Sequence, residues 1–135
     1  LSLTNTPAGR GYSSGQAPDL LDVDNKLIAP LICFEVISPE LTAASVRGGA
    51  QLLVNINDLA WFHQSIIGEQ MIACAVLRAV ENRRDIVFAA NTGPSAVISS
   101  MGKIKSYVGQ NKACNLISKV NFSSKLSTFT GWFVF

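Results

Sequence analysis

The sequence predicts an α/β fold built around a parallel sheet. Two observations predict it: apolar runs typical of buried strands alternate with helical segments, and the order is strand, helix, strand, helix, then several strands. Strand–helix–strand units place consecutive strands in parallel, with the helices packed on the sheet. With 135 residues, 48% of them hydrophobic and 15% charged, the chain can bury the core of one domain and is not expected to be disordered.

The chain divides into three predicted parts. Residues 1–25 are rich in Gly, Pro, Ser and Asp, and we expect an irregular lead-in there. Residues 26–122 are expected to form the core of sheet and helices, and residues 123–135 an aromatic tail. The core opens with the continuous apolar run 26–34, which predicts a strand buried on both faces.

The next segments alternate between helix and strand. Ser-Pro-Glu at 38–40 starts a predicted helix that the Gly pair at 48–49 ends. The apolar run 50–57 predicts a second strand, followed by a polar and aromatic loop. A long helix is expected from residue 64 or 65 to about residue 82. Its apolar positions recur at helical spacing and comprise Ile67, Met71, Cys74, Ala75 and Leu77.

The last part of the core is predicted to be all strands. Residues 85–92 read as a buried strand, and residues 95–100 and 103–108 as two strands of a hairpin joined by Met-Gly. Residues 113–122 are expected to add one more strand.

Composition excludes several classes of function. A net charge of +2 from scattered Lys and Arg residues does not favour nucleic-acid binding. No apolar run reaches the roughly 18 residues of a membrane-spanning helix. The three cysteines lack CxxC spacing and the chain has one histidine, so neither a disulfide framework nor a metal site is predicted, and no cofactor is expected.

Cys33 is the candidate nucleophile. It ends the predicted strand 26–34, where parallel sheets gather ligands and reactive groups, and a helix begins soon after it. That helix N-terminus would favour a thiolate, and the Phe34 N–H would be a natural oxyanion donor. The other interpretation is a small buried apolar residue, which is the commoner role of free cysteine. Cys74, on a helix face, and Cys114, at a strand start, are interpreted as structural.

Glu35 and His63 each have two possible roles. Glu35 is either a solvated carboxylate near the turn or a carboxylate that lines a pocket. His63 lies in the loop after the second strand, where a base for Cys33 is geometrically possible, although a surface or structural role is commoner for a loop histidine.

Three sequence blocks together resemble the carbon–nitrogen hydrolase (nitrilase) superfamily, and within it the bacterial apolipoprotein N-acyltransferases. LICFEVISPEL (31–41) resembles the nucleophile strand and turn, and LLVNINDLAWFHQS (52–65) the following strand and loop. RAVENRRDIVFAANTGPSAVISSMGKI (78–104) resembles a helix end, a strand turn and a hairpin. The likeness covers nearly the whole chain. It implies an α-β-β-α nitrilase-like sandwich that is incomplete, with residues 1–135 as its C-terminal portion.

The resemblance also implies roles for single residues. Cys33 matches the nucleophile, Phe34 stands where these enzymes usually have Tyr, and Glu35 matches the acidic residue after that aromatic. Arg78 and Glu81 match a helix pair that we interpret as architectural, because residues three apart on a helix can bond each other.

Four further residues match the pocket or substrate path. Trp61 and Phe62 match the aromatic pair of the loop, with ordinary core and rim aromatics as the alternative. Asn91 and Gly93 match the strand-end turn near the pocket. Residues 58–60 are one residue longer than the commonest spacing in these enzymes, which is expected to shift the loop.

The implied activity is acyl transfer. Cys33 would take a fatty acyl chain from a phospholipid donor as a thioester and pass it to the N-terminal amine of a lipoprotein acceptor. The family triad is Glu–Lys–Cys, and its Glu and Lys belong to segments upstream of those present here. We therefore expect a truncated sequence that is inactive alone and whose tail leads toward a missing membrane helix. The implied location is the bacterial inner membrane, with the catalytic domain on the periplasmic face.

Two alternatives stay open. The first is a soluble nitrilase- or amidase-type hydrolase that uses the same cysteine on a small amide or nitrile. The second is a non-catalytic remnant that keeps the fold without the triad.

Overall fold

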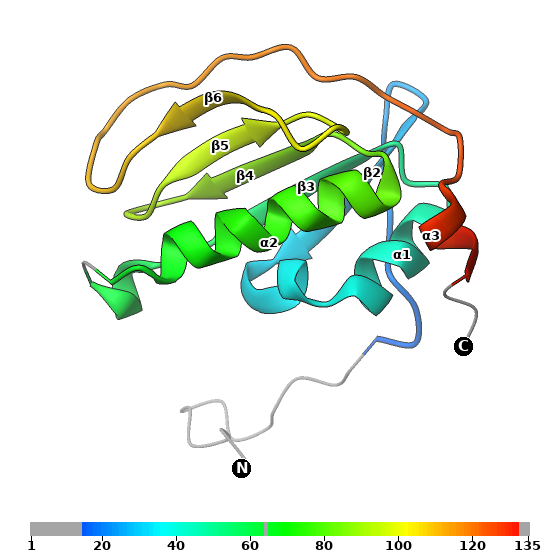
Figure 1. The fold of residues 1–135 in the computed structure, drawn as a ribbon, viewed down its shortest axis with the longest axis horizontal. Coiled ribbons are helices and arrows are strands. Elements are labelled where there is room, and N and C mark those ends of the chain that lie inside the picture. Colours follow the sequence, from blue (N-terminus) through cyan, green and yellow to red (C-terminus); the bar gives the residue numbers. More distant parts are fainter. Residues whose placement is uncertain (1–14, 64, 133–135) are drawn as a thin grey trace.

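The computed structural model describes residues 15–63 and 65–132. Within them, a six-stranded sheet carries its helices on one face (Figure 1). The strands, in their order across the sheet, are β1 (Leu21–Val23), β2 (Lys26–Ile32), β3 (Leu52–Asn57), β4 (Ile86–Ala90), β5 (Ser95–Ile98) and β6 (Ile104–Val108). The helices are α1 (Pro39–Arg47), α2 (Ile67–Asn82) and α3 (Thr128–Trp132), with 3₁₀ turns η1 (Cys33–Ile37) and η2 (Ala60–Phe62).

The centre of the sheet is parallel, as predicted. β2, β3 and β4 pair in parallel, while β1, β5 and β6 pair antiparallel with their neighbours. α1 connects β2 to β3, and α2 connects β3 to β4. Ile32 pairs with Ile56, and Asn57 with Ala90, so the carboxyl ends of the three strands meet at one edge of the sheet. The predicted α/β class and the hairpin of β5 and β6 are confirmed.

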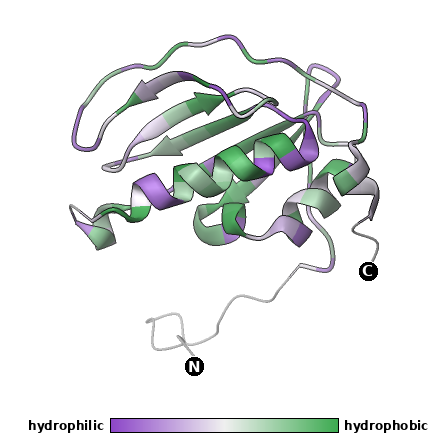
Figure 2. Ribbon diagram, in the orientation of Figure 1, coloured by the Kyte–Doolittle hydropathy of each residue, from purple (hydrophilic) through white to green (hydrophobic). Residues whose placement is uncertain are grey.

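The core lies between the sheet and the helices. Ala29, Leu31, Leu53 and Phe88 are buried there, and each fully buried Leu or Phe side chain contributes about 2 kcal/mol to the free energy of unfolding. Figure 2 shows strands that are largely hydrophobic and an α2 in which hydrophobic and hydrophilic stretches alternate.

The expectation that the strand 26–34 is buried on both faces is wrong for the described residues. β2 stops at Ile32, which is 67% exposed, and its partner Ile56 in β3 is 56% exposed. The physical reason is that the helices cover only one face of the sheet. Side chains alternate along a strand, so the exposed Ile32 and Ile56 lie on the face opposite to the buried Leu31 and Asn55.

The two long helices begin near their predicted positions. Ser38 Oγ accepts a hydrogen bond from the Leu41 N–H at 3.2 Å, which is the predicted N-cap of α1. α2 begins at Ile67, slightly later than expected, and buries Met71 and Ala75 against the sheet. Leu77, which the sequence pattern places on the apolar face, is 56% exposed. The buried face of α2 continues from Met71 in steps of three to four residues, and Leu77 does not fall on it.

The predicted irregular lead-in contains a strand. β1 pairs antiparallel with β2 through a two-residue turn at Asp24 and Asn25. Both turn residues have positive φ angles, 51° and 59°, which Asn and Asp tolerate better than most residues and which matches the twist of a tight hairpin. Residues 1–14 of the lead-in lie outside the described part.

Residues 113–122 do not form the predicted strand. The segment has no regular secondary structure and crosses the sheet without backbone pairing to a strand. Side chains in and beside the sheet bind this segment. Lys105 Nζ donates a hydrogen bond to the Lys119 carbonyl at 3.0 Å, and Asp85 Oδ2 accepts one from the Asn121 N–H at 2.9 Å. The prediction of a strand over 113–122 is therefore wrong, because side-chain hydrogen bonds rather than backbone pairing hold this segment to the sheet.

Two buried charged residues connect distant segments. Asp85 is 1% exposed and accepts hydrogen bonds from Lys105 Nζ at 2.6 Å and from the Ser100 N–H at 2.8 Å. Arg84 is also 1% exposed, and its guanidinium donates to the carbonyls of Ala50 at 2.7 Å and Lys125 at 2.8 Å. Burial lowers the pKa of Arg84. None of the helices formed by residues 15–63 and 65–132 is long and apolar enough to cross a membrane.

Replacement of Asp85 by Asn is expected to lower the free energy of unfolding by about 2 kcal/mol, because it removes a charged acceptor from a buried group of donors. Burial raises the pKa of Asp85, but the hydrogen bonds from Lys105, Asn121 and Ser100 outweigh it and leave that pKa below its ordinary value. The unfolded chain therefore takes up the proton first, and this stability is lost as the pH falls below about 4 through the lowered pKa.

Urea unfolding of the purified protein from about pH 7 down to about pH 2.5 measures both effects. Asp22→Asn, at an exposed position of β1, is the matched control and should change the free energy of unfolding by less than about 0.5 kcal/mol. Equal stability of Asp85→Asn and the unchanged protein at neutral pH would contradict the role given to Asp85.

Candidate functional site

Cys33 lies where β2 ends and η1 begins. Its φ angle is +52°, in the left-handed region that costs a residue other than glycine about 1–2 kcal/mol. The side chain is half-buried and packs against the core cluster between sheet and helices. A cysteine held in a strained turn at the carboxyl edge of a parallel sheet is typical of functional positions. It is also compatible with packing, so the nucleophile role stays a prediction.

Glu35 folds back on this turn. Its carboxylate Oε2 accepts a hydrogen bond from the Ile32 N–H at 2.7 Å, although the residue is exposed. The carboxylate therefore fixes the backbone directly before Cys33. The predicted pocket role of Glu35 stays a prediction, and the structure adds a positional role that the sequence did not indicate.

Two buried asparagines of β3 support the same turn and were missed from the sequence. Asn55 Nδ2 donates to the carbonyls of Leu31 at 3.0 Å and Cys33 at 3.1 Å. Asn57 Nδ2 donates to Asn55 Oδ1 at 2.7 Å and to the Ala89 carbonyl at 3.1 Å. Residues two apart on a strand share one face, so a pair of amides inside an apolar run is a signal that could have been used.

The predicted aromatic residues separate into two environments. The rings of Phe34 and Phe62 meet edge to face, with centroids 5.7 Å apart, and Phe62 also packs against the core. Trp61 in η2 is 79% exposed. His63 follows η2 with a φ angle of +48° and an exposed side chain. Phe34, the residue after Cys33, therefore contacts Phe62 of η2, while the neighbouring Trp61 is exposed.

Asn91 anchors the loop that carries these aromatics. Its Oδ1 accepts from the Leu59 N–H at 3.1 Å, and its Nδ2 donates to Asp58 Oδ1 at 2.7 Å. The hydrogen bond from Asn91, with a second from the Ala60 N–H, lowers the pKa of Asp58. Leu59 is buried against Gly93, where any side chain would collide with it. Asn91 and Gly93 thus hold the loop between β3 and α2.

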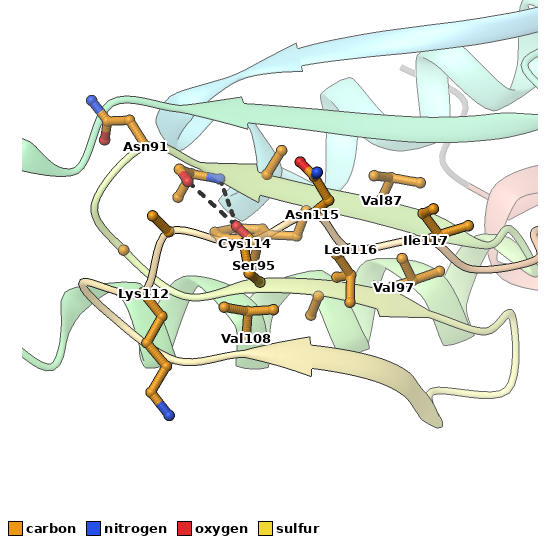
Figure 3. A pocket seen from close by; sticks show the side chains of 16 residues that line it. Val87, Asn91, Ser95, Val97, Val108, Lys112, Cys114, Asn115, Leu116 and Ile117 are labelled. Carbon is orange, nitrogen blue, oxygen red and sulfur yellow. Dashed lines mark hydrogen bonds between the residues drawn. The ribbon is translucent and has the colours of Figure 1, made fainter.

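A cavity in the described part of the chain lies elsewhere. It measures about 600 Å³ and separates β4 and β5 from the segment 112–117, which crosses the sheet on the face turned away from α2 (Figure 3). Asn91, Gly93 and Cys114 line it, and Cys33, Phe34 and Trp61 do not. Ser95 points into this region, with its hydroxyl bonded to the Ala90 N–H at 3.0 Å. The strained cysteine lies at the β2 turn and not in this cavity.

The remaining sequence predictions concern cysteine, metal and the helix pair. Cys74 is half-buried in α2 and Cys114 is exposed. No group of three or more His, Cys, Asp or Glu residues within the described ranges could hold a metal ion. Arg78 and Glu81 form the expected bond, with both guanidinium–carboxylate distances at 2.7 Å, and Arg78 Nη1 also donates to the Ile37 carbonyl at 3.0 Å. The expected bond between them is confirmed.

Comparison with known proteins gives one family. The carbon-nitrogen hydrolase family matches residues 7–124. An apolipoprotein N-acyltransferase of Geobacter metallireducens is 48% identical over 99 residues, which are 73% of this chain and 19% of that protein. The apolipoprotein N-acyltransferase of Prochlorococcus marinus strain SARG is 33% identical over 123 residues, 90% of this chain and 24% of that protein. The chain thus spans about a fifth to a quarter of the length of these curated relatives.

The similar solved structures are amidases. A mutant of the amidase from Nesterenkonia sp. AN1, with acrylamide added at its active site cysteine, has a TM-score of 0.61 and 24% identity and covers 74% of this chain and 41% of that one. A second mutant of the same nitrilase-superfamily amidase has a TM-score of 0.62 and 22% identity and covers 76% of this chain and 41% of that one. At this identity the likeness shows the fold, and it confirms the expected nitrilase-like sandwich, of which this chain forms an incomplete part.

Replacement of Gly93 by Ala should displace the anchored loop. The added methyl group would lie 2.4 Å from Leu59 Cδ1 and 3.2 Å from its Cβ and Cγ, so we expect a loss of about 2 kcal/mol in the free energy of unfolding, measured in urea. In a Leu59→Ala background the same change should cost less than about 1 kcal/mol, because the collisions with Cδ1 and Cγ are gone and only the 3.2 Å approach to Cβ remains.

Gly131→Ala is the control for this substitution. A methyl group there meets no described atom within 4 Å, and the residue lies in α3, so the change should be neutral or stabilising by up to about 1 kcal/mol. Additive costs of Gly93→Ala and Leu59→Ala would contradict the proposed contact between the two positions.

Proposed function

The chain belongs to the carbon–nitrogen hydrolase family, and on that premise we propose that the protein carrying it is an acyltransferase. It moves a fatty acyl chain from a phospholipid, through a thioester on Cys33, to the N-terminal amine of a lipoprotein. The observation that carries this proposal is the similarity to apolipoprotein N-acyltransferases, which reaches 48% identity over 99 residues. The exposed apolar side chains around the Cys33 turn support it.

The reaction proceeds in two steps at one sulfur. The Cys33 thiolate attacks the carbonyl carbon of the phospholipid ester, and the oxyanion that forms collapses to a thioester as the lysophospholipid alkoxide leaves and takes up a proton. The amine of the lipoprotein then attacks the thioester, loses a proton and becomes an amide, while the thiolate of Cys33 is restored. Sulfur suits both steps, because a thiolate is a strong nucleophile and its thioester stays reactive toward an amine.

The site residues take parts that their positions allow. The Phe34 N–H, next to the nucleophile on the turn, stabilises the oxyanion, and Glu35 contributes a carboxylate to the pocket. Ile32, Phe34 and Trp61 are 67%, 40% and 79% exposed at the carboxyl edge of the sheet, and this apolar rim suits contact with an acyl chain. Trp61 and Phe62 line its path, and Asn91 and Gly93 fix the loop that carries them.

The other members of the triad complete the mechanism. A glutamate acts as the general base and a lysine as a second oxyanion partner, and we place both outside the 135 residues. Residues 1–135 then form the C-terminal portion of the catalytic domain, with 26–122 as its core and 123–135 leading toward a membrane helix. The proposed partners are a phospholipid and a lipoprotein at the bacterial inner membrane, with the domain on its periplasmic face.

Hydrolysis of small amides is the alternative reaction. It receives less support, because the likeness to the Nesterenkonia amidase lies below 25% identity and concerns the fold alone. The two activities differ in the acceptor, which is water for a hydrolase and an amine for an acyltransferase. A non-catalytic role would leave Cys33 without any acyl intermediate.

The acyl intermediate is the measurable consequence. When the protein that carries this chain is incubated with acyl-labelled phospholipid, label sensitive to hydroxylamine should accumulate on Cys33, and Cys33→Ser should abolish it. Addition of an N-terminal lipopeptide amine should discharge the label into an amide. Mass spectrometry of tryptic peptides locates the acyl group.

The two remaining cysteines supply the controls. Cys74→Ser and Cys114→Ser should leave the labelling unchanged, since neither lies at the end of a parallel strand. Label on Cys74 or Cys114 would show that Cys33 is not the nucleophile. Turnover by the 135 residues alone would refute the placement of the glutamate and lysine outside the chain.

A further inference from the structure

We propose that Asn55 is a positioning residue that aims the Phe34 N–H at the oxyanion, and that Asn57 holds Asn55 in place. The inference rests on the proposed function, because it assigns a role within a reaction at Cys33. It concerns a side chain of β3 that does not belong to the family triad and that reaches the nucleophile turn from the neighbouring strand.

The geometry of one peptide unit carries the argument. The Cys33 carbonyl and the Phe34 N–H belong to the same planar peptide group and point in opposite directions. Asn55 Nδ2 donates to the Cys33 oxygen at 3.1 Å and so draws that oxygen toward β3. The Phe34 N–H is thereby turned away from β3. As the second residue of η1, Phe34 has no acceptor for its N–H within that short helix, so the group is free to serve a substrate oxygen.

The Leu31–Ile32 peptide unit, two units before that of Cys33 and Phe34, is held from both ends. Asn55 Nδ2 also donates to the Leu31 carbonyl at 3.0 Å, and Glu35 Oε2 accepts from the Ile32 N–H at 2.7 Å. Leu31 C=O and Ile32 N–H belong to one peptide group. The Leu31–Ile32 and Cys33–Phe34 peptide groups are thus both held by side-chain hydrogen bonds, and these bonds support the short stretch of backbone in which Cys33 keeps its φ angle of +52°.

The amide of Asn55 is itself locked. Asn55 is fully buried, and its Oδ1 accepts a hydrogen bond from Asn57 Nδ2 at 2.7 Å. Asn57 Nδ2 donates in turn to the Ala89 carbonyl at 3.1 Å, which ties the relay to β4. In a buried setting such a chain of amides polarises each member, and this strengthens the bond to the Cys33 oxygen.

Asn57 is a costly residue at this position. It is 5% exposed, and its Oδ1 accepts no hydrogen bond from the described residues. An unpaired buried acceptor is destabilising, so an apolar side chain would serve the fold better here. The orientation of Asn55 by Asn57 explains why a destabilising polar side chain occupies this position.

Two chemistries at the same sulfur separate this role from a structural one. Acylation of Cys33 by p-nitrophenyl butyrate passes through an oxyanion, whereas alkylation by iodoacetamide does not. Asn55→Leu removes both donated bonds with little change of volume. In the protein that carries this chain, with Cys74 and Cys114 replaced by Ala, it should slow acylation by about 10²-fold and leave the alkylation rate within about twofold.

Asn82→Leu is the matched control. Asn82 is a fully buried amide that donates to the Arg78 carbonyl and accepts from Thr130 Oγ1, with no bond to the Cys33 turn. The Asn82→Leu variant should keep the ratio of the acylation rate to the alkylation rate, even if its free energy of unfolding falls.

If the Asn55→Leu variant does not fold, the Asn57→Ala variant tests the proposal. The same ratio should fall about tenfold, a smaller loss than for Asn55→Leu because Asn55 keeps its donors.

The outcomes distinguish this inference from the proposed function. Absence of acylation at Cys33 in the unchanged protein would overturn both. Acylation in the unchanged protein, with the same ratio of acylation to alkylation in the asparagine variants, would overturn the role of Asn55 and leave Cys33 as the nucleophile. Equal slowing of acylation and alkylation would show that Asn55 acts on the thiol or on the fold, and would also overturn it.

Discussion

The parallel pairing of β2 with β3 is the constraint on which the site depends. In its register Ile32 lies opposite Ile56, so the turn that follows β2 meets the polar end of β3. Side chains alternate along a strand, and a slip of one residue would send Asn55 to the opposite face of the sheet. The Cys33 carbonyl would then lose its donor, and the strained turn would lose its support. Packing of Leu31 and Leu53 against the helices fixes this register, so the hydrophobic core determines the geometry of a polar site.

The sequence predicted the elements whose signals are local. The start of α1 was read from Ser38 and its neighbours, and the parallel centre from apolar runs separated by helices. The position of Cys33 at the carboxyl edge followed from that order. These features were accessible because caps and periodicity depend on residues close in the chain. The resemblance to the family then added roles that local patterns could not supply.

Features that depend on distant partners were missed. Residues 113–122 have an apolar pattern like that of a strand, but their contacts are with Asp85 and Lys105 through side chains. The role of Asn55 requires knowledge of which strand lies beside β2, and in sequence its amide reads as an interruption of an apolar run. Asn91 and Gly93 were expected near a pocket, and the structure also makes them the support of the loop that contains Leu59.

The buried guanidinium of Arg84 links the position of the C-terminal segment to that of the residues that precede β3. Its acceptors on Ala50 and Lys125 lie 34 and 41 residues away in sequence, on either side of it. A cation removed from water before those carbonyls arrive would be strongly unfavourable. The bond from Arg84 to the C-terminal segment is therefore most favourable once the β3 edge is in place, and loss of that edge would weaken the docking of the segment. Arg84 thus couples the two regions, together with the hydrogen bond that the Ser123 N–H donates to the Gln51 carbonyl at 3.2 Å.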